Sequence, residues 1–129
     1  MSKKTKILII DDSNTNVVLL EAVFSGKGYV VETALNAYEA FNSMDKEIPD
    51  LILLDLLMPK ISGFDFMENI RNKDEFKNIP VIVISAVSDY DNVQKIKQMG
   101  IYDYIKKPVD IEELEEKVEK LLSLSNVKQ

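Results

Sequence analysis

Five short apolar runs recur along the chain, and they restrict its fold more than any other feature. They cover residues 6–10, 29–34, 51–54, 81–84 and, more weakly, 102–105. Several are continuously apolar and rich in β-branched residues, which is typical of strands buried on both faces of a parallel sheet. The sequence therefore predicts a five-stranded sheet covered by helices.

The segments between these runs repeat their apolar residues with the period of an α-helix. Four predicted faces are Val17, Leu20 and Phe24; Ala37, Ala40, Phe41 and Met44; Phe66, Met67 and Ile70; and Ile111, Leu114, Val118 and Leu121. A capping residue three positions before an acid marks helix starts at Ser62, Ser88 and Asp110. Gly28 and Gly100 suit the turns that follow two of the helices.

Five strands that alternate with five helices predict a doubly wound, flavodoxin-like α/β fold. Strands of such a sheet commonly run in the order 2-1-3-4-5, and ligands bind where the order reverses, beyond the carboxyl ends of strands 1 and 3. The length of 129 residues suits one domain. We expect its core to span residues 4–122 and the tail from Ser123 to be frayed.

Composition narrows the possible partners. Hydrophobic residues make up 46% of the chain, enough for a core. The net charge of −6 disfavours direct binding to nucleic acid or to an anionic membrane, and no stretch approaches the roughly 20 apolar residues of a membrane span. With no Cys or His, any chemistry must use carboxylates, hydroxyls or lysines. We expect a bacterial cytoplasmic protein.

Acidic residues follow two strands that are neighbours in the predicted sheet. Asp11 and Asp12 follow the first run, and Asp55 follows the third. Clustered carboxylates oppose one another's ionisation unless a cation joins them, and oxygen ligands with open water positions suit Mg2+. A single Asp after a strand is more often a turn residue or a helix cap. Two acidic strand ends at one crevice favour a functional site.

The other strand ends add a hydroxyl and an ammonium. Ser85 ends the fourth strand, and Lys107 follows the fifth. Each alone is typical of a turn residue or a solvated lysine. Together with the acids they indicate a site for a phosphoryl group, whose transfer needs in-line positioning and charge neutralisation. A carboxylate can serve as the nucleophile.

From Lys4 to about Leu122 the chain resembles the receiver domain of two-component response regulators. The residues that carry the resemblance are Asp11-Asp12, Asp55-Leu-Leu-Met-Pro59 with Gly63, Ser85-Ala86 and Asp103-Tyr-Ile-Lys-Lys-Pro108. The resemblance implies that Asp55 is the phosphoacceptor. It also implies that Asp11, Asp12, Asp55 and the backbone carbonyl of Leu57 hold Mg2+. Gly63 most simply meets a backbone need near a helix start.

The resemblance assigns further roles. Lys107 would pair with the phosphoryl oxygens and be joined to Pro108 by a cis bond, while Ser85 and Tyr104 would turn inward as switch residues. From the residues alone, a packed aromatic of the fifth strand is as good an interpretation of Tyr104 as a switch residue. The phosphoryl donor would be a histidine kinase or a phosphotransfer protein. The recipient of the signal would be an effector protein or an output domain outside this sequence, and a dimer through the fourth helix, fifth strand and fifth helix is possible.

The fourth helix, residues 89–98, offers mainly Val93 and Ile96 as apolar anchors. It is therefore the helix that we expect to move most easily, shifting the surface that it forms with the fifth strand and fifth helix. Leu57 and Val87 lie two positions after Asp55 and Ser85. Neither can orient an attacking water, so we expect a long-lived phosphoryl state.

Three other functions stay open from the sequence alone. A Mg2+-dependent phosphatase or phosphotransferase with Asp55 as nucleophile would usually need a second carboxylate at position 57, which is Leu. A flavin-binding module would need a phosphate loop where Asp11 and Asp12 would repel the phosphate. A protein-binding domain with vestigial acids would take up no phosphoryl group. We favour a signalling switch without substrate turnover, not an enzyme.

Overall fold

The computed structural model describes residues 4–58, 60–87 and 89–127. Strands and helices alternate in the order β1 (Lys6–Ile10), α1 (Asn14–Gly26), β2 (Val30–Ala34), α2 (Ala37–Lys46), β3 (Leu51–Leu54), α3 (Gly63–Arg71), β4 (Val81–Ser85), α4 (Tyr90–Gln98), β5 (Asp103–Lys106) and α5 (Ile111–Val127). The five strands are parallel and lie in the order β2-β1-β3-β4-β5. This order confirms the predicted topology.

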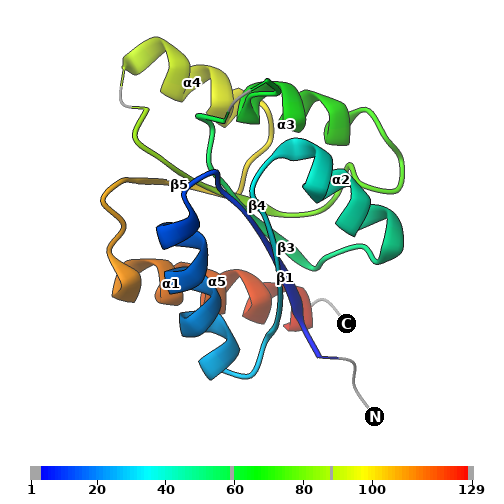
Figure 1. The fold of residues 1–129 in the computed structure, drawn as a ribbon, viewed down its shortest axis with the longest axis vertical. Helices are drawn as coiled ribbons and strands as arrows, with labels where there is room; N and C mark the ends of the chain where they lie inside the picture. The colour runs from blue at the N-terminus through cyan, green and yellow to red at the C-terminus, as the bar shows by residue number, and fades with distance from the viewer. Residues whose placement is uncertain (1–3, 59, 88, 128–129) are drawn as a thin grey trace.

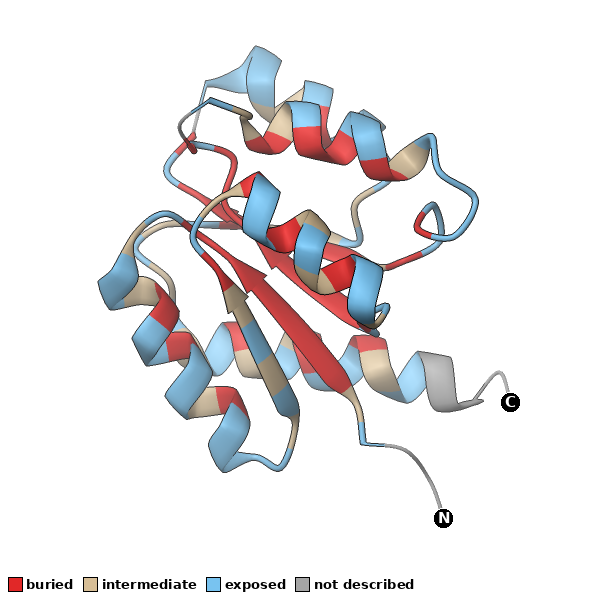
Figure 2. Cartoon of the chain, turned by 45° about the vertical axis from the view of Figure 1, so that its right-hand side comes forward, coloured by how far each residue is buried: buried red, intermediate tan, exposed pale blue. Residues whose placement is uncertain are grey.

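Helices cover both faces of the sheet (Figure 1). On one face, Ile7 and Ile9 of β1 pack in a cluster with α1 and α5. On the other face, Leu8 and Ile10 pack in a cluster with α2, α3 and α4. The middle strands β1, β3 and β4 are buried at every position (Figure 2). Because both faces are covered, these strands need apolar residues without alternation.

The predicted apolar faces of the helices contact the sheet. Their buried members are Val17, Leu20 and Phe24; Ala37, Ala40 and Met44; Phe66, Met67 and Ile70; and Leu114, Val118 and Leu121. Phe41 and Ile111 are only partly buried beside the two core clusters. All nine residues of α4 are described, and Ile96 alone among them is buried. The helix predicted to have the fewest anchors is thus the least buried.

The helix starts follow the capping pattern with one difference. The Ser62 side chain accepts a hydrogen bond from the N–H three residues on, and so does the side chain of Asp110. Ser88 lies outside the described residues. The cap of α4 is Asp89, whose carboxylate accepts the Asn92 N–H at 3.2 Å. The negative charge of Asp89 also interacts favourably with the positive, N-terminal end of the helix dipole.

The C-terminal helix is longer than predicted. We expected a frayed tail from Ser123 to Gln129, whereas α5 continues to Val127. Residues 128 and 129 lie outside the described residues. No Gly or Pro interrupts residues 122–127, and helix propagation is favourable once a turn is formed. None of the helices in the described part of the chain is long and apolar enough to cross a membrane.

Candidate functional site

Three carboxylates meet at the carboxyl edge of the sheet. Asp11 follows β1 and Asp55 follows β3, and the two strands pair in register up to Ile10 and Leu54. The Asp55 N–H continues the ladder by donating to the Ile10 carbonyl at 2.9 Å. One carboxylate oxygen from each of Asp11, Asp12 and Asp55 lies within 4.8 Å of the others, with Asp11 and Asp55 buried and Asp12 exposed. The predicted gathering of the acids is confirmed.

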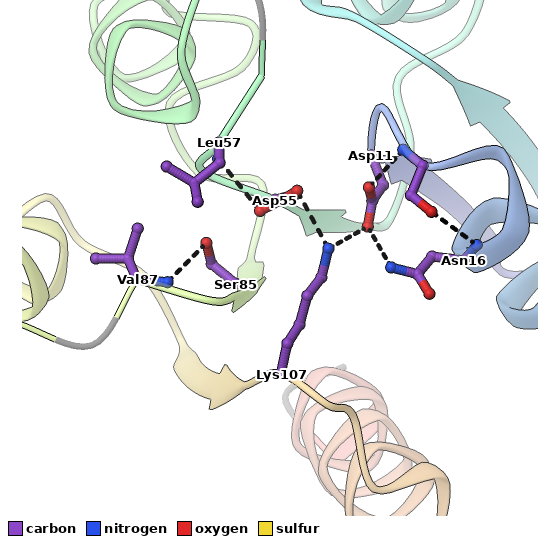
Figure 3. A network of polar contacts seen from close by, with 8 residues as sticks. Asp11, Asn16, Asp55, Leu57, Ser85, Val87 and Lys107 are labelled. Carbon is purple, nitrogen blue, oxygen red and sulfur yellow. Dashed lines mark hydrogen bonds and ion pairs between the residues drawn. The ribbon is translucent and has the colours of Figure 1, made fainter.

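Lys107 lies between the two buried acids (Figure 3). Its Nζ is 3.0 Å from Asp11 Oδ2 and 3.2 Å from Asp55 Oδ2. The lysine follows β5 directly, and its backbone N–H donates to the Ser85 carbonyl at 2.9 Å. Its bond to Pro108 is cis, as the family resemblance implies. A residue 52 positions from Asp55 thus completes an ion-paired cluster.

Burial dominates the electrostatics of this cluster. It raises the pKa of Asp55 above the ordinary value, an effect that the Asp11 charge adds to and that the Leu57 N–H, the Lys107 ammonium and the Ser85 hydroxyl oppose. Burial also lowers the pKa of Lys107, but hydrogen bonds and charges from Asp11 and Asp55 outweigh it, so the net pKa is raised. Lys107 therefore stays an ammonium at neutral pH. Within the described cluster, three carboxylates face this single ammonium, which leaves an oxygen-only donor set suited to a hard cation.

The first turn of α1 holds Asp11. The Ser13 N–H donates to Asp11 Oδ1 at 2.8 Å, and the Asn16 amide donates to Asp11 Oδ2 at 3.4 Å. The Ser13 hydroxyl also caps the helix by accepting the Asn16 N–H. Sequence reasoning singled out neither residue. A Ser before an apolar periodic segment is a usable cap signal, but no spacing shows that Asn16 turns toward an acid.

Gly63 seats α3 against the backbone that carries Asp55. Its N–H donates to the Leu56 carbonyl at 2.8 Å. A Cβ at this position would lie 2.5 Å from the Leu56 Cα and 2.7 Å from the Asp55 carbonyl oxygen. Only glycine fits this approach, which confirms the expected backbone need. Pro59, in the loop between β3 and α3, lies outside the described residues.

Leu57 joins the site through its backbone. Its N–H donates to Asp55 Oδ1 at 3.2 Å, while its side chain is 53% exposed beside the acids. The N–H contact restrains the rotation of the Asp55 carboxylate. The role of the Leu57 carbonyl as a metal ligand stays a prediction.

Ser85 and Tyr104 meet at the loop between β4 and α4. Ser85 is buried at the end of β4, and its Oγ accepts the Val87 N–H at 3.4 Å. Tyr104 is partly buried, and its hydroxyl donates to the Val87 carbonyl. Burial raises the pKa of Tyr104, with the charges of Asp55 and Asp89 adding to the effect. Both predicted switch residues thus contact the backbone of Val87. The Ser85 hydroxyl also lowers the pKa of Asp55.

Comparisons with known proteins agree with this geometry. A family model described as "Response regulator receiver domain" matches residues 7–119. Sporulation initiation phosphotransferase F of Bacillus subtilis is 37% identical over 121 residues, which cover 94% of this chain and 96% of that protein. A solved structure of a two-component response regulator from Clostridium difficile has a TM-score of 0.89 and 28% identity, and the match covers 95% of this chain and 99% of that one.

Other relatives are longer. A probable transcriptional regulator of Guillardia theta is 33% identical over 126 residues, which cover 98% of this chain and 48% of that protein. The chain thus spans about half the length of this relative, and nearly all of the Bacillus protein. Similar sequences occur both as proteins of this size and as parts of longer ones.

Proposed function

The chain belongs to the response regulator receiver family, and from that premise we propose that Asp55 accepts a phosphoryl group in a two-component or phosphorelay system. One observation carries the proposal. The buried carboxylates of Asp11 and Asp55 share the Lys107 ammonium, with an oxygen of Asp12 within 4.8 Å of theirs. This arrangement places a nucleophile beside an excess of negative charge that a divalent cation would neutralise.

In the proposed reaction, a carboxylate oxygen of Asp55 attacks the phosphorus of a phosphohistidine. A new P–O bond forms while the P–N bond breaks, and the electron pair of that bond leaves with the imidazole of the donor. The proposed donor is a histidine kinase or a phosphotransfer protein, as for other receiver domains. This chain has no His, so it cannot be that donor itself.

Mg2+ is the proposed cofactor, since the donor set consists of oxygens and its acids exceed its ammonium. Asp11, Asp12, Asp55 and the Leu57 carbonyl would hold it, directly or through water. When bound, the ion neutralises charge on the carboxylates and on the phosphoryl oxygens. Lys107, already 3.2 Å from Asp55, would pair with a phosphoryl oxygen on the same carboxylate.

The response to phosphorylation is proposed to pass through Val87. Ser85 and Tyr104 both bond its backbone, so movement of the Ser85 hydroxyl toward a phosphoryl group would disturb the start of the α4 segment. The changed surface of α4, β5 and α5 would control an effector protein, an output domain or a dimer. We propose that the chain acts as one receiver domain with its core over residues 4–122, and that it promotes only its own phosphorylation and dephosphorylation.

Intact mass tests the proposal directly. Incubation of the protein with acetyl phosphate and Mg2+ should add the mass of one phosphoryl group, and a metal chelator should prevent the addition. Asp55→Asn should abolish it. Asp45→Asn, which changes an exposed acid on α2 in the same way, should leave it intact.

Two results would contradict the proposal. Unchanged mass of the wild type with acetyl phosphate and with a phosphorylated histidine donor would indicate a binding domain with vestigial acids. Steady release of inorganic phosphate from many substrate molecules per protein would indicate the phosphatase that the sequence left open.

A further inference from the structure

Asn16, on the first turn of α1, shares an oxygen of Asp11 with Lys107. Its amide nitrogen lies 3.4 Å from Asp11 Oδ2, and Lys107 Nζ lies 3.0 Å from the same oxygen (Figure 3). The other oxygen, Oδ1, accepts the Ser13 N–H at 2.8 Å. Both oxygens of Asp11 therefore have a donor from the start of α1. Contacts at both oxygens restrain rotation of the carboxylate about its last side-chain bond.

The Asn16 side chain is not needed to cap its own helix. Ser13 does that, through a hydroxyl that accepts the Asn16 backbone N–H at 3.4 Å. The amide instead faces a cavity of about 500 Å³ between α1 and the segment that follows β5. Apolar residues make up most of the wall of this cavity: Leu19, Leu20, Ile84, Pro108 and Val109. Asp11 and Lys107 are the other polar residues of this wall, so the amide has the buried Asp11 carboxylate as its acceptor and apolar side chains around it.

Phosphorylation would affect the two hydrogen-bond donors to Asp11 Oδ2 differently. Lys107 also contacts Asp55, and the proposed function turns its ammonium toward the phosphoryl group. Asn16 makes no such second contact with an acid in the described part of the chain. After Lys107 has turned, Asn16 is thus the side-chain donor that stays on Asp11.

We propose that Asn16 is a positioning residue for Mg2+. Its amide holds the Asp11 carboxylate toward the metal whether or not Lys107 also contacts that carboxylate. This inference rests on the proposed function and adds to it a residue outside the ligand set. Residues that orient a metal ligand through a hydrogen bond typically change metal affinity by 10–100-fold when they are replaced. The long Asn16 contact places the expected effect at about tenfold, the lower end of that range.

Titration calorimetry with Mg2+ alone, on the unphosphorylated protein, tests the inference. Asn16→Leu keeps the size of the side chain, removes its donors and presents an apolar group to the apolar wall. We expect it to weaken Mg2+ binding about tenfold. Asn14→Leu makes the same change at an exposed position of the same turn and should leave the affinity unchanged. Asn16→Gln keeps an amide and should lose less affinity than Asn16→Leu.

The rate of phosphorylation and the thermal midpoint distinguish a positioning role of Asn16 from a general loss of structure in the variant. At limiting Mg2+, the rate with acetyl phosphate should fall for Asn16→Leu, and a higher Mg2+ concentration should restore much of it, because the substitution lowers the population of the metal-bound form. The thermal midpoint without Mg2+ should also be close to wild type. If Asn16→Leu proves unstable, Asn16→Ala replaces it in the same titration.

Two outcomes overturn the role of Asn16 while the proposed function stands. Wild-type Mg2+ affinity in Asn16→Leu is one, and an equal loss of affinity in Asn14→Leu is the other. If the wild-type protein neither binds Mg2+ nor takes up a phosphoryl group, the proposed function itself fails, whatever the variants do.

Discussion

Helices α3 and α4 have nine residues each and pack on the same face of the sheet, yet they are anchored differently. The buried residues of α3 are Gly63, Phe66, Met67 and Ile70, whereas α4 buries Ile96 alone. Burial of apolar surface is the main favourable term in folding. One flank of the acid site is therefore held by more buried apolar side chains than the other.

The two helices also connect to the acids in different ways. Gly63 presses α3 against the backbone of Asp55 and Leu56. Among the described residues, Ser85 and Tyr104 contact the Val87 backbone, which leads toward α4, and Lys95 of α4 lies over the Phe64 ring of α3. Under the proposed function, a well-anchored helix behind Asp55 and a weakly anchored helix beyond Ser85 would let one surface change while the site keeps its own geometry.

Arg71, the last residue of α3, restrains one end of α4. Its guanidinium donates to the Lys77 and Ile79 carbonyls at 3.0 Å and to the Gly100 carbonyl, just after α4, at 2.9 Å. Burial lowers the pKa of Arg71, as expected for a guanidinium that is partly removed from water. The C-terminal end of α4 is therefore tied to α3, while the described contact at its N-terminal end is the cap that Asp89 makes with the Asn92 N–H.

Matched truncations give the sharpest test of the difference between the helices. Ile70 and Ile96 are both 0% exposed. Ile70→Ala should lower the free energy of unfolding of the whole domain by about 3 kcal/mol, because Phe66 and Met67 keep α3 docked over the cavity that results. Ile96→Ala should cost less, about 1–2 kcal/mol, because α4 can detach before the rest unfolds. Urea unfolding measures both values.

Hydrogen exchange of the Ile70→Ala and Ile96→Ala variants shows which segments lose protection. In Ile96→Ala, protection should fall mainly in residues 90–98. In Ile70→Ala, it should fall across the domain. Equal and domain-wide losses in the two variants would contradict the unequal anchoring of α3 and α4.

The guanidinium bridge offers the next largest effect. Arg71→Met keeps the apolar stem but leaves three carbonyls without their donor, and should lower the free energy of unfolding by about 2 kcal/mol. Amide exchange should speed up around Gly100 more than around Val87. Arg71→Lys should recover little, since one ammonium cannot reproduce the planar fork. Unchanged stability in Arg71→Met would show that the bridge does not restrain α4.

The ionised Asp55 carboxylate should lower the stability of the fold. Burial raises the pKa of Asp55, so the folded state disfavours the ionised carboxylate at neutral pH. Asp55→Asn should therefore raise the free energy of unfolding by about 1 kcal/mol at pH 7 in the absence of Mg2+. As the pH falls through the raised pKa, the wild-type carboxyl takes up a proton and the advantage of Asn should vanish. Thermal unfolding at pH 7 and pH 4 measures both parts, and a less stable Asp55→Asn at pH 7 would contradict them.

The lifetime of the phosphoryl group should show the smallest effect. Leu57 is apolar and 53% exposed, and Val87 is 9% exposed, so neither side chain can orient a water toward the phosphorus. Leu57→Asn should shorten the lifetime several-fold, equivalent to less than about 1.4 kcal/mol in the barrier. The rate at which the phosphoryl group is lost after removal of acetyl phosphate measures this lifetime. A wild-type half-life of a few seconds would contradict the prediction of a long-lived state.

The sequence predicted the buried strands best. β1 and β3 match their predicted bounds because their apolar runs end sharply at acidic residues. The edge strands differ from the prediction by one residue: β2 begins at Val30 instead of Tyr29, and β5 covers Asp103–Lys106 instead of residues 102–105. An edge strand is partly exposed, so its polar residues blur the pattern.

The acid cluster was predictable because parallel strands bring their carboxyl ends to one edge of the sheet. The residues that position it were not. Asn16 and Arg71 are polar residues on helices, and from sequence alone each is typical of a solvated face. Their roles depend on which oxygen comes within reach after folding, Asp11 Oδ2 in one case and three loop carbonyls in the other. Such contacts do not repeat with the period of a helix or a strand, so no sequence pattern predicts them.

The most direct test of the switch is hydrogen exchange of the wild-type protein with and without acetyl phosphate and Mg2+, with Asp55→Asn as the control. Phosphorylation should change protection in residues 86–105, most strongly at the N-terminal end of α4, and leave residues 64–70 of α3 as they were. The control should show no change in either segment. Unchanged protection across residues 86–105 in a protein whose mass shows full phosphorylation, or an equal change in α3, would contradict the account.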